Sequence, residues 1–134
     1  MFHFDSYPIC SNNRINWCVI AFHLEDDGPM GYENYGISQR ICWDGIAVPH
    51  LYTVTQATFD VTPWNYEIVV GFRHNCTVSG KIVEIIAREL DVKIWEDDWA
   101  VNTRMVIDNR GNPTSSGWRA DEFNGKRVTI PDRA

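Results

Sequence analysis

The sequence predicts an α+β fold in which one mixed, mostly antiparallel sheet of about five to seven strands carries one long helix packed on a face. The 134 residues suit a single domain spanning residues 1–134, because compact domains most often hold about 100–150 residues. Short runs rich in β-branched and aromatic residues, separated by turn residues, are typical of strands. One longer stretch, about residues 78–91, repeats its apolar residues with helical spacing.

The first half of the chain reads as a meander of strands. Residues 16–24 are apolar on both faces, as expected of a central strand, and the acidic run before Gly28-Pro29 ends it. Residues 30–36 are rich in Gly and Tyr and are expected to form a loop. Further strands are expected at residues 37–43, 46–48 and 51–54, with a tight turn at Asp44-Gly45 and a continuation of the last strand toward residue 61.

The predicted helix lies between two predicted strands, at residues 66–72 and 92–95. Its hydroxyl cap is Thr77 or Ser79, because a side-chain oxygen can accept from the free amides of the first turn. Strand, helix and strand in this order predict a right-handed crossover that joins two parallel strands. The apolar stripe of the helix consists of Val78, Ile82, Ile85, Ile86 and Leu90.

The last third of the chain shows weaker patterns. A strand is expected at residues 101–107, followed by a dense turn signal at residues 108–113. Residues 114–117 are small and polar, which is typical of a loop. Residues 126–130 are expected to pair at the edge of the sheet.

The charge balance excludes some classes of partner. Eighteen acidic residues against 12 Lys and Arg give a net charge of −6, whereas nucleic-acid binding draws most of its affinity from cationic side chains. No apolar run approaches the ~18–20 residues of a membrane helix, and the first residues lack the features of a signal peptide. We therefore expect a cytoplasmic protein that binds neither nucleic acid nor membrane.

The cysteines and histidines indicate no metal site. Cys10, Cys18, Cys42 and Cys76 are widely spaced and form no C-x-x-C pair, so free thiols in a reducing compartment are expected. The four histidines have no ligand spacing such as H-x₃-H. We expect no metal and no cofactor.

A candidate anion site lies where the strand at residues 66–72 meets the predicted helix. The start of a helix favours an anion, and this loop adds cationic and hydroxyl groups that can hold a phosphate or carboxylate. Neither the Walker spacing nor that of a tyrosine-phosphatase loop is present, and an ordinary capped helix entry is the alternative. We single out no catalytic residue. The candidate anion ligands are Arg73, His74, Thr77, Ser79 and Lys81.

A second candidate site is an acidic, aromatic surface. Trp and Tyr are enriched among the residues that dominate interface energies, and acidic surfaces steer basic partners. In the alternative interpretation Trp95 belongs to the core and residues 96–98 form a solvated connection. The candidate partner-binding residues are Trp95, Glu96, Asp97, Asp98 and Trp99, extended by Glu25, Asp26, Asp27, Tyr32 and Tyr35.

These features favour a binding protein over an enzyme. In size, acidity and lack of catalytic motifs the chain resembles bacterial toxin-immunity proteins and phage counter-defence inhibitors, which implies a protein that blocks a larger partner with a basic surface. One alternative is a small enzyme or ligand-binding domain that holds a phosphate- or carboxylate-bearing molecule at residues 73–81. The other is a structural or assembly subunit, and the sequence leaves the oligomeric state open.

Overall fold

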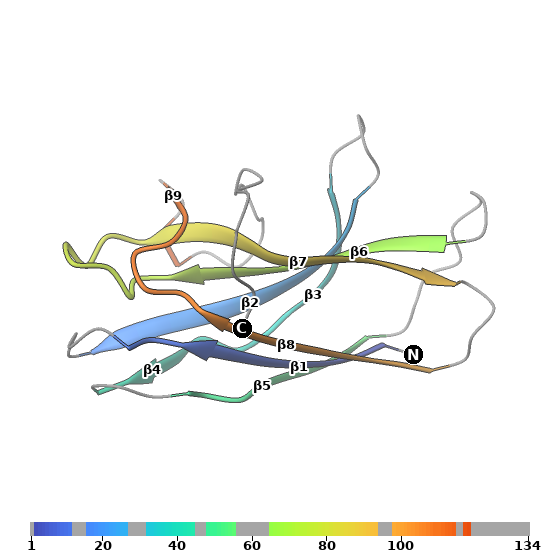
Figure 1. Cartoon of the computed structure of the whole chain (residues 1–134), viewed down its shortest axis with the longest axis horizontal. Coiled ribbons are helices and arrows are strands. Elements are labelled where there is room, and N and C mark those ends of the chain that lie inside the picture. Colours follow the sequence, from blue (N-terminus) through green and yellow to red (C-terminus); the bar gives the residue numbers. More distant parts are fainter. Residues whose placement is uncertain are drawn as a thin grey trace.

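The computed structural model describes residues 2–11, 16–26, 32–44, 48–55, 65–93, 98–114 and 117–118. Within them the chain is all-β and forms two sheets that pack face to face as a sandwich (Figure 1). The predicted α+β fold, with a single sheet and one long helix, is therefore wrong. The part of the chain described also contains no helix with the length and apolar character of a membrane span.

The two sheets differ in size and in strand direction. The smaller sheet has three strands in the order β5-β1-β8, with β1 antiparallel to β5 and parallel to β8. The larger has six strands in the order β3-β2-β6-β7-β9, with β4 also paired to β2, and all its described pairings are antiparallel. The strands are β1 (Phe2–Ile9), β2 (Trp17–Asp26), β3 (Tyr32–Ile37), β4 (Ile41–Trp43), β5 (Leu51–Thr55), β6 (Asn65–His74), β7 (Val83–Lys93), β8 (Trp99–Val106) and β9 (Asn112–Pro113).

The helix expected at residues 78–91 is replaced by strand β7, which forms an antiparallel hairpin with β6. Both faces of β7 are covered: Ile85 packs between the two sheets, whereas its neighbour Ile86 packs on the opposite face of the larger sheet. A strand buried on both faces is apolar at adjacent positions, and such a run can also match helical spacing. The predicted parallel crossover is wrong for the same reason.

Most of the other strand predictions are confirmed, with shifted ends. The exceptions are β1, which lies in a segment to which we assigned no strand, and β3, which covers residues expected to form a loop. The strand expected at residues 126–130, most of that at residues 46–48 and the continuation from residue 56 to residue 61 lie outside the described residues. The predictions at residues 16–24, 51–54, 66–72 and 101–107 are confirmed as β2, β5, β6 and β8. The strand predicted at residues 37–43 is only partly present, because residue 37 ends β3, residues 38–40 form no strand and β4 covers residues 41–43.

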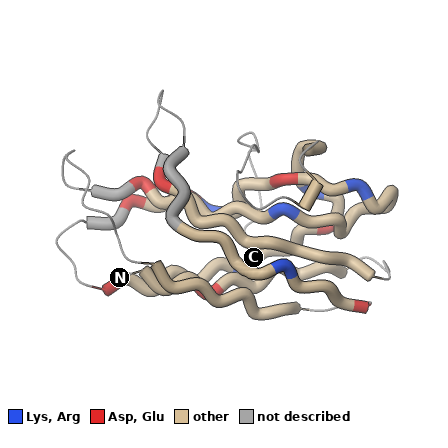
Figure 2. Tube along the Cα trace, turned by 180° about the vertical axis from the view of Figure 1, so that it is seen from behind, with Lys and Arg blue, Asp and Glu red and all other residues tan. Residues whose placement is uncertain are grey.

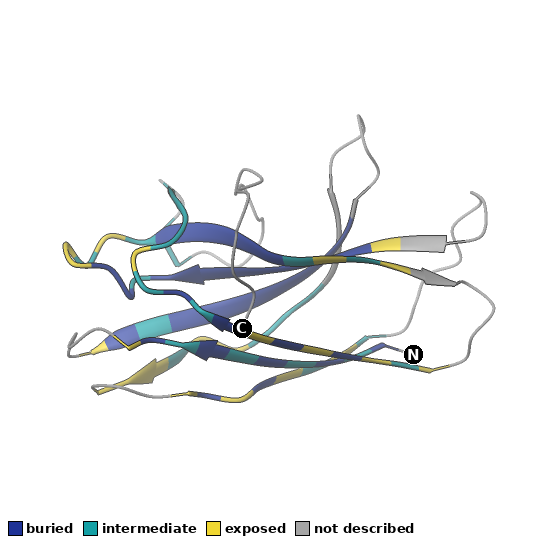
Figure 3. Cartoon of the chain, in the orientation of Figure 1, coloured by how far each residue is buried: buried dark blue, intermediate teal, exposed yellow. Residues whose placement is uncertain are grey.

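Consecutive residues are buried along β2, β6 and β7 of the larger sheet, whereas burial alternates along β1 and β8 of the smaller sheet (Figure 3). The main cluster between the sheets joins residues of both, among them Trp17, Phe72 and Met105. A second cluster covers the other face of the larger sheet, where Trp118 packs against residues that include Phe22. On the outer face of the smaller sheet the described residues are half-buried on β1 and mostly exposed on β5 and β8.

Candidate functional site

The outer face of the smaller sheet carries polar and aromatic side chains on all three strands. Every second residue of β1 is buried, so His3, Asp5 and Tyr7 point away from the core. The register places Asp5 opposite Tyr52 of β5, and Tyr7 opposite Arg104 of β8. Strand pairing therefore assembles this face from three segments that lie far apart in the sequence.

Each of two histidines on this face is held by a neighbouring side chain. Nε2 of His50 donates to Oδ1 of Asp5 across 2.6 Å. Nδ1 of His3 shares a hydrogen bond of 2.8 Å with the hydroxyl of Tyr52. The ring centroids of His50 and Tyr52 are 6.2 Å apart, so the two pairs adjoin.

The Tyr7 ring connects these pairs to a cation. It stacks on His50 with ring centroids 4.7 Å apart and an interplanar angle of 7°. The guanidinium carbon of Arg104 lies 5.0 Å from the centroid of the Tyr7 ring, within the range of a cation–π interaction. We call these interacting residues the β1 face: His3, Asp5, Tyr7, His50, Tyr52 and Arg104.

The β1 face holds one pair of the kind used in general acid–base catalysis. His50 and Asp5 are placed as a general base and its orienting acid would be. The pair is also open to water, with side-chain exposures of 47% and 24%. Catalytic pairs gain their strength from sites that exclude water, and this pair does not lie in such a site.

Part of the predicted acidic, aromatic surface borders the β1 face. Oδ1 of Asp98 lies 3.9 Å from Nε2 of His3. Trp99 is opposite Phe2 at the start of β8 and is half-buried, so it belongs partly to the core. Glu25 is buried, so it does not extend a solvent-facing patch. Asp26, Tyr32 and Tyr35 lie in β2 and β3 without described side chains, and Trp95, Glu96, Asp97 and Asp27 lie outside the described residues.

The predicted anion loop is the turn of the β6–β7 hairpin, so the helix start that was to attract an anion is absent. Arg73 is fully buried and donates from Nε to Oε1 of Glu84 across 2.7 Å. Thr77 is also buried, and its hydroxyl donates to the carbonyl of Lys81. Ser79 accepts from the amide of Lys81 across 3.3 Å, and both residues are exposed. The five candidate residues thus lie close together in sequence without converging on one open pocket.

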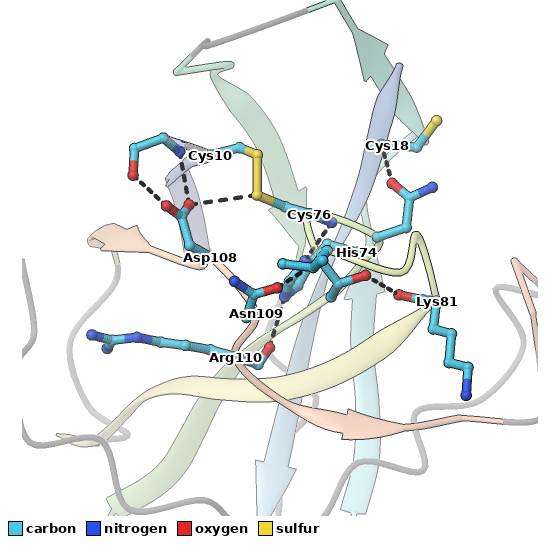
Figure 4. Close-up of a disulfide and its surroundings, with 12 residues drawn as sticks. Cys10, Cys18, His74, Cys76, Lys81, Asp108, Asn109 and Arg110 are labelled. Atoms are coloured by element: carbon cyan, nitrogen blue, oxygen red, sulfur yellow. Dashed lines mark hydrogen bonds between the residues drawn. A yellow bond between two sulfur atoms is a disulfide. The ribbon is translucent and has the colours of Figure 1, made fainter. Parts of the chain in front are cut away.

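His74 has a structural role in the same hairpin (Figure 4). Nε2 of its ring donates to the carbonyl of Arg110 across 2.8 Å, and Nδ1 accepts from the amide of Cys76. Burial lowers the pKa of His74 to about 4, although the Arg110 carbonyl and the Asp108 carboxylate act in the opposite direction. A neutral His74 therefore links the end of β6 to the turn after β8.

The cysteines form two disulfides, so the expectation of free thiols is wrong. Cys10 pairs with Cys76 and Cys18 with Cys42. The pairs were hidden in the sequence because the fold brings them together: Cys18 and Cys42 are opposite each other on β2 and β4, and Cys10 after β1 meets Cys76 in the β6–β7 turn. Asp108 lies beside the buried Cys10–Cys76 bond and accepts from both the amide and the hydroxyl of Ser11 (Figure 4). Cys10, Cys76 and Asp108 lie close enough to ligate a metal, but both sulfurs are committed to the disulfide.

Sequence reasoning missed the β1 face, although one signal was present. Apolar and polar residues alternate from Phe2 to Asp5, which is the pattern of a strand with one buried face. No sequence signal joins this segment to His50 or Arg104, because strand register decides that contact. No protein-family model, curated protein or solved structure matches this chain. The β1 face therefore supplies the contacts and charges from which a function is inferred.

Proposed function

We propose that this chain is a small acidic binding protein that blocks a larger protein partner through the β1 face. The observation that carries the proposal is the network of imidazole, phenol, guanidinium and carboxylate groups held in place on an exposed sheet. Tyr and Arg are enriched among the residues that dominate interface energies. Because the network already orders these side chains, binding costs little further rotamer entropy.

The charge distribution favours a partner with a basic surface. Asp5 belongs to the β1 face, Asp98 borders it, and the whole chain carries a net charge of −6. Acidic residues gather at the end of the molecule that holds the N-terminus (Figure 2). Such a field speeds the approach of a cationic partner and is screened by salt. An inhibitor of the toxin-immunity or counter-defence kind would use it to cover a cationic active site.

The compartment is part of the proposal. The wide spacing of the cysteines suggested the cytoplasm, but disulfides form and persist in oxidising surroundings. The two cysteine pairs therefore favour action outside a reducing cytoplasm. A small-molecule site at residues 73–81 is no longer favoured, because no helix begins there and Arg73 is buried against Glu84.

The proposal is tested by affinity capture of partners with the wild-type chain and two single variants, Tyr7→Ala and Arg104→Ala. Each variant removes one member of the stacked group and is expected to weaken binding about tenfold, the scale of a residue that dominates an interface. The captured partner is then measured by surface binding kinetics. A partner that binds both variants as tightly as the wild type would exclude the β1 face.

A matched pair of charge reversals tests the electrostatic part. Asp98→Lys and Asp91→Lys alter net charge equally, but Asp98 lies beside His3, whereas Asp91 is exposed on β7 of the other sheet. We expect Asp98→Lys alone to slow association several-fold at low salt, with the difference lost at high salt. Equal rates for the two variants would remove Asp98 from the interface.

A further inference from the structure

Strand β5 forms an edge of the smaller sheet without the protection that edge strands usually carry. Among the described strands it pairs with β1 alone. Natural proteins block exposed edges with charged residues or Pro, and two other edges of this molecule carry such residues, Arg104 on β8 and Pro113 on β9. By contrast, β5 reads Leu-Tyr-Thr-Val-Thr and has no charged residue.

Exposed apolar residues lie on β5, just before it and on β4, and Figure 3 shows exposed positions on both of these strands. Tyr52 and Val54 of β5 are 53% and 42% exposed, and Val48 just before the strand is 46% exposed. Trp43 of β4, an uncharged edge strand of the larger sheet, is 42% exposed. An open groove of about 500 Å³ lies between β5 and the segment of residues 37–41. Single exposed apolar residues are common, but a row of them beside an open edge marks an interaction surface.

We infer that the occupant of this edge is a second copy of the same chain, paired antiparallel through β5 across a two-fold axis. The local charge supports this choice, because two chains of net charge −6 repel each other except where their contact surfaces carry no charge. The two-fold arrangement also lets one uncharged edge protect another, which closes the contact after two copies.

The side-chain pattern of β5 suits a two-fold axis at Thr53. Centring the pair there leaves all five residues of each strand matched and places Tyr52 of one copy opposite Val54 of the other. Both residues face outward, so the contact is an aromatic and β-branched cross-strand pair, a type that stabilises antiparallel sheets. Five-residue strands bury less area than a permanent dimer interface needs, so the dimer dissociates on dilution.

This dimer goes beyond the proposed function, because it places two copies of the β1 face on one continuous outer surface. The smaller sheets would join in the order β8-β1-β5-β5-β1-β8. Two linked binding faces raise apparent affinity for a partner that presents two sites, without any new contact to either.

Sedimentation velocity of the isolated chain over a range of concentrations tests the inference. The wild type is expected to show a reversible monomer–dimer equilibrium. Tyr52→Lys/Val54→Lys places like charges opposite each other and is expected to weaken the dimer about tenfold or more. The control, Val78→Lys/Ser79→Lys, adds the same charge at exposed positions in the β6–β7 turn and keeps the wild-type equilibrium. A wild type that stays monomeric throughout, or a dimer insensitive to the β5 variant, would overturn the inference.

Cross-linking tests the register. Tyr52→Cys mixed with Val54→Cys is expected to give covalent dimers on mild oxidation, whereas Val78→Cys alone gives few. Equal yields from the two samples would contradict pairing about Thr53. Neither experiment contains a partner protein, and the Tyr7 and Arg104 variants used above leave β5 unchanged. Failure of the dimer is therefore distinguishable from failure of the proposed function.

Discussion

His23 and His74 couple the stability of the fold to pH at the scale of single residues. Both are fully buried, and burial lowers the pKa of His23 to about 3 and that of His74 to about 4. In the unfolded chain a histidine has a pKa of about 6.5. Between these values the unfolded state binds protons that the native state does not, so stability falls as the pH falls.

We therefore expect the free energy of unfolding in urea to decrease between about pH 6.5 and pH 4, by up to about 1.4 kcal/mol per histidine for each pH unit. His74→Gln should reduce this slope, because it removes one of the two buried histidines. An unchanged slope in His74→Gln would show that His74 does not cause the pH dependence of stability.

Arg73 and Glu84 form a buried ion pair, and losing one partner is expected to cost more stability than losing both. Their side chains are 0% and 1% exposed, and the Arg73 guanidinium also packs over the Phe22 ring. Desolvation offsets much of the attraction, but removal of one partner leaves a buried charge. Glu84→Ala is expected to cost about 3–5 kcal/mol in urea unfolding, and the double variant Arg73→Met/Glu84→Leu clearly less. A double variant at least as unstable as Glu84→Ala would show that the pair itself stabilises the fold.

At the scale of elements, the two disulfides join different parts of the sandwich. Cys18–Cys42 connects neighbouring strands of one sheet and is partly exposed, because Cys42 faces solvent. Cys10–Cys76 ties the end of β1 to the β6–β7 turn, and both of its residues are fully buried. Access of a thiolate to the sulfur limits reduction, so exposure separates the two bonds.

We expect dithiothreitol under native conditions to reduce Cys18–Cys42 first and Cys10–Cys76 only when the fold opens, as measured by alkylation and peptide mass spectrometry. Loop entropy predicts that loss of the 66-residue link costs about 4 kcal/mol and loss of the 24-residue link about 3 kcal/mol. Simultaneous reduction of both bonds in the folded protein would contradict this order.

Strand β7 shows which kind of strand the sequence pattern does not identify. The strands β2, β5, β6 and β8 are recognisable because β-branched and aromatic runs end at turn residues. For β7 the same run matched a helix, because Ile85 and Ile86 serve opposite faces of one sheet. The sequence pattern alone does not distinguish a strand covered on both faces from an amphipathic helix. The packed layers on both sides of β7 do distinguish them.

For the whole molecule, the first strand is the centre of the smaller sheet. β1 provides every described pairing of β5 and β8, and it supplies Phe2 and Phe4 to a cluster that includes Ile68 and Val70 of the larger sheet. A chain without residues 1–9 would leave β5 and β8 as unpaired strands with exposed apolar faces.

We expect deletion of residues 1–9 to abolish cooperative urea unfolding, read from the near-ultraviolet circular dichroism of the buried aromatic residues. The control Phe4→Leu keeps an apolar side chain at the same position and should remain cooperative, with a loss of about 1–1.5 kcal/mol. A truncated chain that unfolds cooperatively would mean that the larger sheet folds alone.

The sequence by itself determined the local features of this protein: its acidity, the positions of its clearest strands and the turns that end them. The tertiary structure decided the rest: β7 as a strand, the cysteine pairs, and the contact of Asp5 with His50 and of Tyr7 with Arg104. The physical reason is that strand pairing is non-local. Local propensity acts over a few neighbouring residues, whereas register and two-sided burial depend on segments up to a hundred residues apart.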